Sequence, residues 1–148
     1  AMSCDYRVMA QGYSIGLNEV KFGLMPPIWF LPTATNVLGH ASAERLCTTG
    51  VLLEASQAQS IGLVDEVVKE DEVLEVAEKE LLSVLGTTNA SARGMSKQAF
   101  RLDAVDSLAK DADVDAEMFC SLALSDPIQA SLHQYMEALK AKSKGKGA

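Results

Sequence analysis

Cysteines, basic side chains and long apolar runs are all scarce in this chain of 148 residues, and each shortage limits what it can be. Cys4, Cys47 and Cys120 are odd in number, lie far apart and form no C-x-x-C pair. This spacing argues against a disulfide framework or a zinc site and predicts free thiols in a reducing compartment. We expect all three to be small buried hydrophobic side chains.

Acidic residues outnumber basic ones, with 20 Asp and Glu against 13 Lys and Arg and a net charge of −7. Such a surface repels phosphate backbones, so we expect no nucleic-acid partner. No apolar stretch reaches the ~18 residues of a transmembrane helix, so no membrane span is expected. Hydrophobic residues make up 48% of the chain, which is typical of one globular domain with a sizeable core.

Strand signals are confined to the first half of the chain, and helical periodicity fills the rest. We expect strands over 6–10, 13–17 and 63–68. Helices are predicted from Pro27 towards Gly39, over 40–49, after a capping box at Ser56 and Gln59, from Asp71 to Gly86, over 90–102, over 104–124 and after Ser125. Two or three short strands do not make a stable sheet, so they need strands from preceding chain or another subunit.

The last helix carries an apolar stripe with helical spacing: Ile128, Leu132, Tyr135, Met136 and Leu139. A stripe of this kind normally faces a core or a neighbouring helix. We therefore expect these five side chains to be buried against the rest of the protein or another subunit.

One carboxylate, Glu19, lies inside an otherwise apolar segment from Tyr13 to Leu24, and a Pro26-Pro27 turn follows it. Burying a carboxylate costs several kcal/mol unless it is paired or neutralised. Apolar surroundings disfavour the charged form, which makes Glu19 a candidate general base. The alternative is an ordinary solvated glutamate near a turn.

Four segments together resemble one known family: Cys4 to Ala10, Ile15 to Leu24, Gly39 to Gly50, and Ser56 to Val68. They resemble the enoyl-CoA hydratase/isomerase (crotonase) superfamily over almost the whole chain. The Gly16-Leu-Asn-Glu19 form, with Trp29 and Phe30 soon after the proline pair, is most similar to the mitochondrial delta3,delta2-enoyl-CoA isomerases.

The resemblance implies an α/β fold, the C-terminal part of a crotonase-type spiral of ββα turns followed by a helical trimerisation region. Residues 1–70 would be the end of the spiral core with the active-site segment, and residues 71–148 the helical region that forms oligomers. Family members hold the thioester oxygen with two backbone N–H donors. By resemblance both donors would lie upstream of Ala1, so the chain would have a base without its oxyanion hole.

By the same resemblance, Glu19 is the catalytic residue that moves a proton from C2 to C4, converting a 3-enoyl-CoA to the trans-2-enoyl-CoA in fatty-acid β-oxidation. Leu17, Asn18, Trp29 and Phe30 are expected to bind substrate. Asn18 would orient Glu19 or is simply a turn residue, and the two aromatic side chains would line the acyl pocket or belong to core or a subunit contact. Alternatives are an enoyl-CoA hydratase, or a non-catalytic truncated crotonase-like piece that binds CoA thioesters or other subunits.

Expected partners are an acyl-CoA thioester and either further copies in a trimer or a complementing N-terminal segment. No cofactor or metal is expected, because CoA is part of the substrate and proton transfer needs neither. The resemblance implies the mitochondrial matrix, with peroxisome or cytoplasm as alternatives. No targeting segment is visible at the start, and the chain does not end in Ser-Lys-Leu.

The remaining polar residues have structural interpretations. Asp5 and Arg7 are expected to pair with each other. Lys97 and Arg101, one helical turn apart, are expected on a solvated face, with contact to CoA phosphates as the alternative. His40 and His133 are expected at the surface.

Overall fold

The strands are short and pair in two separate ribbons in the computed structural model, which describes residues 1–145. β1 (Val8–Ala10) pairs in parallel with β4 (Glu66–Val68), with Val8 opposite Glu66. β2 (Ser14–Ile15) pairs antiparallel with β3 (Leu53–Glu54). The three expected strands are confirmed in shortened form, while β3 was not expected. Sheets of two strands are marginal alone, so helices must hold them.

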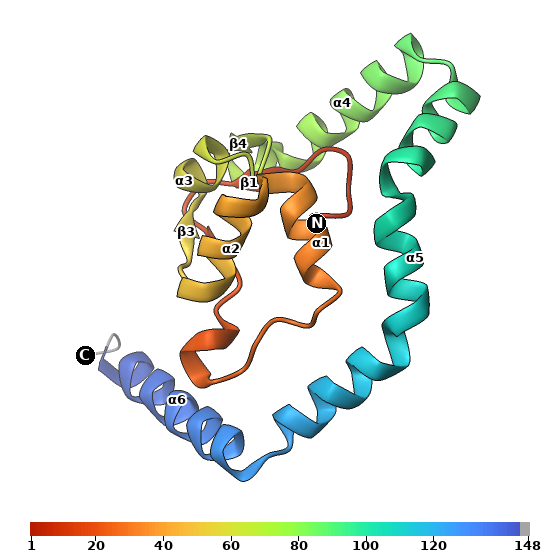
Figure 1. The fold of residues 1–148 in the computed structure, drawn as a ribbon. Helices are drawn as coiled ribbons and strands as arrows, with labels where there is room; N and C mark the ends of the chain where they lie inside the picture. Colours follow the sequence, from red (N-terminus) through yellow and green to blue (C-terminus); the bar gives the residue numbers. More distant parts are fainter. Residues whose placement is uncertain (146–148) are drawn as a thin grey trace.

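Four short helices pack with these ribbons to form the body, residues 1–69 (Figure 1). They are the 3₁₀ helix η1 (Glu19–Phe22) and the α-helices α1 (Phe30–Leu38), α2 (His40–Thr49) and α3 (Ala55–Ser60). The Phe30 N–H donates to the Pro27 carbonyl at 2.9 Å, so the expected helix starts three residues after this proline. Pro32 then falls in the first turn, where a missing N–H costs nothing.

The capping box of α3 lies two residues before the expected one. Glu54 ends β3 in an extended conformation (φ −62°, ψ 154°) and serves as the N-cap. Its N–H donates to Gln57 Oε1 at 3.1 Å. Ser56 and Gln59 are therefore inside the helix, and the prediction of a box at those two residues is wrong.

An arm of three helices wraps around the body (Figure 1). After the 3₁₀ turn η2 (Glu70–Glu72), it contains α4 (Val73–Thr87), α5 (Ala90–Ala123) and α6 (Asp126–Gly145). α5 is one continuous helix of 34 residues, so the prediction of two helices divided near residue 103 is wrong. Asp103 is no helix breaker, and neither glycine nor proline stands beside it. Residues 146–148 of the predicted helical region lie outside the described residues.

The core is small for this chain length. The buried residues Leu46, Ala58, Leu63 and Val64 form its centre, between α2, α3 and β4. The accessible surface is 10226 Å² for 15.8 kDa. A compact monomer of that mass exposes about 7,300 Å². The chain therefore exposes roughly 40% more surface than a self-contained domain of its size.

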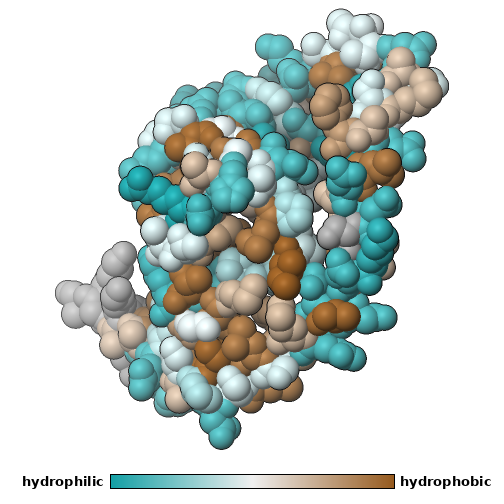
Figure 2. Space-filling model, viewed as in Figure 1, coloured by the Kyte–Doolittle hydropathy of each residue, from teal (hydrophilic) through white to brown (hydrophobic). Residues whose placement is uncertain are grey.

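Much of this surplus is apolar and lies on the arm. Leu74, Leu81 and Leu82 of α4 are each more than half exposed, and Phe100 of α5 is 89% exposed. Figure 2 shows hydrophobic side chains gathered in the middle of one face, between the body and the arm. A self-contained monomer rarely exposes apolar area on this scale.

We expect these 148 residues alone not to behave as a well-folded monomer. Sedimentation of the isolated chain should reveal self-association, and amides in residues 4–17 should exchange quickly. A compact monomer with strongly protected amides in that segment would contradict the expectation.

The apolar stripe of α6 is only partly buried. Ile128 is 8% exposed, and Leu132 and Tyr135 are partly buried. Met136 and Leu139 are 52% and 43% exposed, so the rest of this chain does not bury them. For these two, burial against another subunit stays a prediction.

The cysteines are free thiols, as expected, but only Cys47 is buried. Cys4 and Cys120 are exposed, so the expectation of burial is wrong for both. Cys4 lies in the N-terminal segment, and Cys120 lies near the end of α5 on the arm, where little of the chain packs against it. His40 and His133 are exposed, as expected.

The N-terminal segment is tied to the arm by one carboxylate. Asp5 accepts hydrogen bonds from Arg93, from Lys97 Nζ at 2.9 Å and from Arg101 at 2.8 Å. The solvated face predicted for Lys97 and Arg101 is therefore wrong. Arg7 instead pairs with Asp65 at 2.9 Å, so the predicted Asp5–Arg7 pair is also wrong. These partners are 58 to 96 residues apart in the sequence, beyond the reach of local pattern.

This cluster should make stability fall in acid. Lys97 and then Arg93 lower the pKa of Asp5 from 3.8 to about 2, against partial desolvation that raises it. Since the folded pKa is depressed, the stabilisation is present above pH 3.8 and is lost as the pH falls towards 2. Because Asp5 is about a third exposed, the effect is modest.

We expect Asp5→Asn to lower the Tm at pH 7 by about 2–4 °C, with the difference disappearing near pH 2. Calorimetry across this pH range tests it, and a difference independent of pH would contradict it.

Candidate functional site

Glu19 is the first residue of η1, a single 3₁₀ turn that follows Asn18. The Lys21 N–H donates to the Asn18 carbonyl at 3.0 Å, and the Leu24 N–H donates to the Glu19 carbonyl at 3.1 Å. Gly23, in the left-handed region (φ 86°), ends the turn. Backbone hydrogen bonds therefore close a tight turn over residues 18–24, and Glu19 lies within it.

Two glycines let this turn approach the end of α2. A Cβ on Gly16 would lie 2.4 Å from the Val51 carbonyl oxygen, closer than any real contact. Gly50 has φ +60°, and a Cβ there would lie 2.8 Å from Val20 Cγ2. Only glycine permits both the left-handed conformation and the close approach at position 50. The segment around Glu19 is therefore seated against residues 50–52.

A side chain at position 16 should not be tolerated. We expect Gly16→Val to destabilise the fold by about 2–4 kcal/mol and to abolish any activity that depends on Glu19. Gly86→Ala is the matched control, because α4 leaves open space around that position, and alanine there should be neutral or stabilising by up to about 1 kcal/mol. Denaturant unfolding measures both variants, and equal stabilities would contradict the role of Gly16.

The Glu19 carboxylate is partly withdrawn from water. Its Oε2 atom is buried, and no hydrogen-bond partner reaches it within residues 1–145. Cys47 lies on α2, the helix that packs on η1. Burial raises the pKa of its thiol, and the nearby Glu19 charge raises it further. A buried carboxylate oxygen without a donor is rare and calls for an explanation, of which a catalytic role is one.

The Asn18 side chain donates from Nδ2 to the Tyr135 hydroxyl on α6 at 3.5 Å. Among the described residues, no hydrogen bond joins the Asn18 side chain to the Glu19 carboxylate. Of the two interpretations from sequence, its backbone fits the turn residue, as the residue that precedes η1. Leu17 lies just before it and is partly buried.

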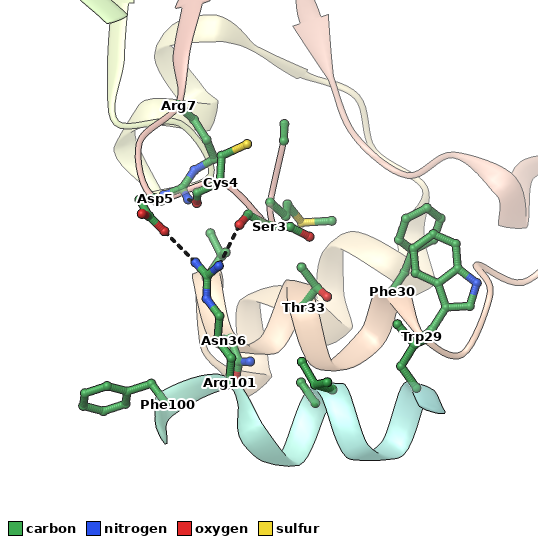
Figure 3. A pocket seen from close by; sticks show the side chains of 16 residues that line it. Ser3, Cys4, Asp5, Arg7, Trp29, Phe30, Thr33, Asn36, Phe100 and Arg101 are labelled. Carbon is green, nitrogen blue, oxygen red and sulfur yellow. Dashed lines mark hydrogen bonds and ion pairs between the residues drawn. The ribbon is translucent and has the colours of Figure 1, made fainter. Parts of the chain in front are cut away.

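Trp29 and Phe30 lie apart from this turn, at one end of a cleft of about 740 Å³. Their rings contact each other, with centroids 3.9 Å apart and planes tilted by 41°. α1, α5 and the N-terminal segment form the walls, and Arg101 crosses the opening to Asp5 and Ser3 (Figure 3). Glu19 does not line this cleft. The described residues therefore bring Leu17, Asn18 and Glu19 together and hold the two aromatic side chains elsewhere.

The part of the chain that the structure describes holds neither a metal-binding cluster nor a membrane-spanning helix. Among the described residues, no three His, Cys, Asp or Glu side chains are grouped to hold a metal ion. In the same part of the chain, no helix has the length and apolarity to span a bilayer.

Comparison with known protein families matches residues 1–146 to the family described as enoyl-CoA hydratase/isomerase. The chain therefore belongs to this family, and the resemblance inferred from its motifs is confirmed. The expected fold class is confirmed by the solved crotonase-fold structures it matches.

Among individual relatives, the chain is 41% identical over 144 residues to mitochondrial enoyl-CoA delta isomerase 1 of Mus musculus, covering 96% of this chain and 50% of that protein. It is 32% identical over 119 residues to the short-chain-enoyl-CoA hydratase of Clostridioides difficile, covering 80% of this chain and 76% of that protein. The crystal structure of human mitochondrial delta3-delta2-enoyl-CoA isomerase matches with a TM-score of 0.88 and 35% identity, over 96% of this chain and 55% of that one. The chain thus spans about half the length of the isomerases it matches.

Proposed function

We propose that the natural protein carrying this sequence is an enoyl-CoA isomerase that converts a 3-enoyl-CoA to the trans-2-enoyl-CoA, with Glu19 as its base. One observation carries this proposal. Glu19 Oε2 is buried without a hydrogen-bond partner among residues 1–145, in a turn built tightly by Gly16 and Gly50. The isomerases among the relatives support the choice of reaction.

In the proposed reaction, Glu19 takes the proton from C2 of the substrate, and the electron pair moves into the thioester as an enolate. The same carboxyl group then returns the proton to C4 while the double bond forms between C2 and C3. Glutamate is unchanged at the end, and no oxidant, metal or cofactor is consumed. One carboxylate held in a fixed position suffices.

The enolate oxygen needs donors that stabilise its developing charge. We assign these donors to the half of the relatives' length that this chain does not match. The exposed apolar side chains of the arm would be covered by that unmatched half, and by further copies of the protein in a trimer. The relatives' names support a location in mitochondria.

The test is steady-state conversion of a 3-enoyl-CoA by the natural protein that carries this sequence. The readout is the absorption of the conjugated thioester that forms as the product. Formation of the 2-enoyl-CoA without added cofactor is the expected result. Addition of water to a 2-enoyl-CoA, without movement of the double bond, would favour the hydratase. Binding of CoA thioesters without turnover would favour the non-catalytic alternative.

A further inference from the structure

Two helices pack on η1, the turn that carries Glu19. One is α2, through Gly50. The other is α6, at the far end of the chain. None of the four residues of η1 is buried. Hydrogen bonds in a 3₁₀ turn are poorly aligned, so such a turn depends on its neighbours for a single conformation.

α6 contacts the turn at both of its ends. Before η1, the Tyr135 hydroxyl accepts a hydrogen bond from Asn18 Nδ2 at 3.5 Å. At its last residue, the Phe22 ring lies against the Tyr135 ring with centroids 5.2 Å apart and planes tilted by 44°. Immediately after it, Gly23 lies so close to Ile128 that a Cβ would be 2.8 Å from Ile128 Cδ1.

Tyr135 is the side chain that spans the turn from Asn18 to Phe22. The two ring centroids lie within the range of about 4.5–7 Å over which aromatic pairs attract each other. The hydrogen bond is at the long limit for this interaction and contributes less. Most of the restraint that Tyr135 places on the turn therefore comes from its aromatic ring, and the hydroxyl contributes the weaker hydrogen bond to Asn18.

We propose that Tyr135 is a positioning residue for Glu19. It fixes η1 against α6 and so holds the carboxylate in place, without itself contacting the substrate. This inference rests on the proposed function of Glu19 as the base. It assigns the last helix a part in the chemistry of a turn encoded more than a hundred residues earlier.

Three variants of the natural protein test the proposal: Tyr135→Ala, Tyr135→Phe and, as control, Met136→Ala at a half-exposed position of α6. A misplacement of about 1 Å can cost about 10²-fold in rate. We expect Tyr135→Ala to lower kcat by about tenfold or more with KM within about twofold, because positioning acts on the chemical step. Tyr135→Phe keeps the ring and should retain at least about a third of kcat, since only the long hydrogen bond is lost.

Amide hydrogen exchange gives a readout that does not depend on the reaction. In Tyr135→Ala, the amides of Lys21, Gly23 and Leu24 should exchange at least about tenfold faster, while amides of β1 and β4 keep their rates. Met136→Ala should change neither kcat nor exchange.

An unchanged kcat in Tyr135→Ala would overturn the proposal, and so would a uniform rise in exchange across the body, which would indicate a general structural role. If the natural protein does not move the double bond at all, the proposed function fails. Exchange at the amides of Lys21, Gly23 and Leu24 then still decides whether Tyr135 fixes the turn.

Discussion

Replacing Glu19 by Gln will lower the kcat for double-bond transfer by about 10²–10⁴-fold in the natural protein that carries this sequence. Glutamine keeps the size and shape of the side chain and removes only its ability to accept a proton. The buried Oε2 atom has no hydrogen-bond partner among the described residues, so the amide breaks no observed hydrogen bond of that atom. KM should change little, because the variant removes an interaction made during the chemical step.

Steady-state kinetics with a 3-enoyl-CoA measure this effect. The matched control is Glu78→Gln, an exposed glutamate on α4 far along the chain from the turn. Its kcat should stay within about twofold of the natural protein, as expected for a surface substitution. Near-natural turnover in Glu19→Gln would remove this carboxylate from the mechanism.

Placing a charge at Ile128 should have the largest effect on stability. This side chain is 8% exposed and lies against Gly23. Ile128→Asp would put an unpaired carboxylate into that contact and should cost about 3–5 kcal/mol. Leu132→Asp, at a partly buried position of the same stripe, should also destabilise the protein by a few kcal/mol or disrupt its assembly.

Denaturant unfolding of the natural protein measures these effects. Met136→Asp is the matched control, since Met136 is 52% exposed on the same helix, and it should cost no more than about 1 kcal/mol. Equal midpoints for Ile128→Asp and Met136→Asp would mean that α6 does not pack on the turn, and the positioning of Glu19 by this helix would fail with it.

Local pattern predicted part of the surroundings of Glu19. The apolar residues around it indicated a carboxylate withdrawn from water, and the structure buries one oxygen of that glutamate. The C-terminal limits of α1 and α2 also followed from Gly39 and Gly50. These signals act over a few residues, which is the range that a sequence pattern describes.

Long-range partners could not be predicted in the same way. Asp5 and Arg7 look like a pair in sequence, yet the oppositely charged partners of each lie at least 58 positions away. Tyr135 was visible only as one member of an apolar stripe, and nothing in that stripe indicated Asn18, 117 residues earlier, as its partner. Helical spacing also did not predict which side chains of the α6 stripe this chain buries, because Met136 and Leu139 are exposed while Ile128 is buried.

The separation between Asn18 and Tyr135 has a consequence for biosynthesis. A ribosome adds about 5–20 residues per second, so the 117 residues between the turn and its partner take roughly 6–23 s to make. Until α6 has emerged, the Glu19 turn has only its contact with α2. The carboxylate would then gain this restraint late, only when α6 has been made and docks against the turn.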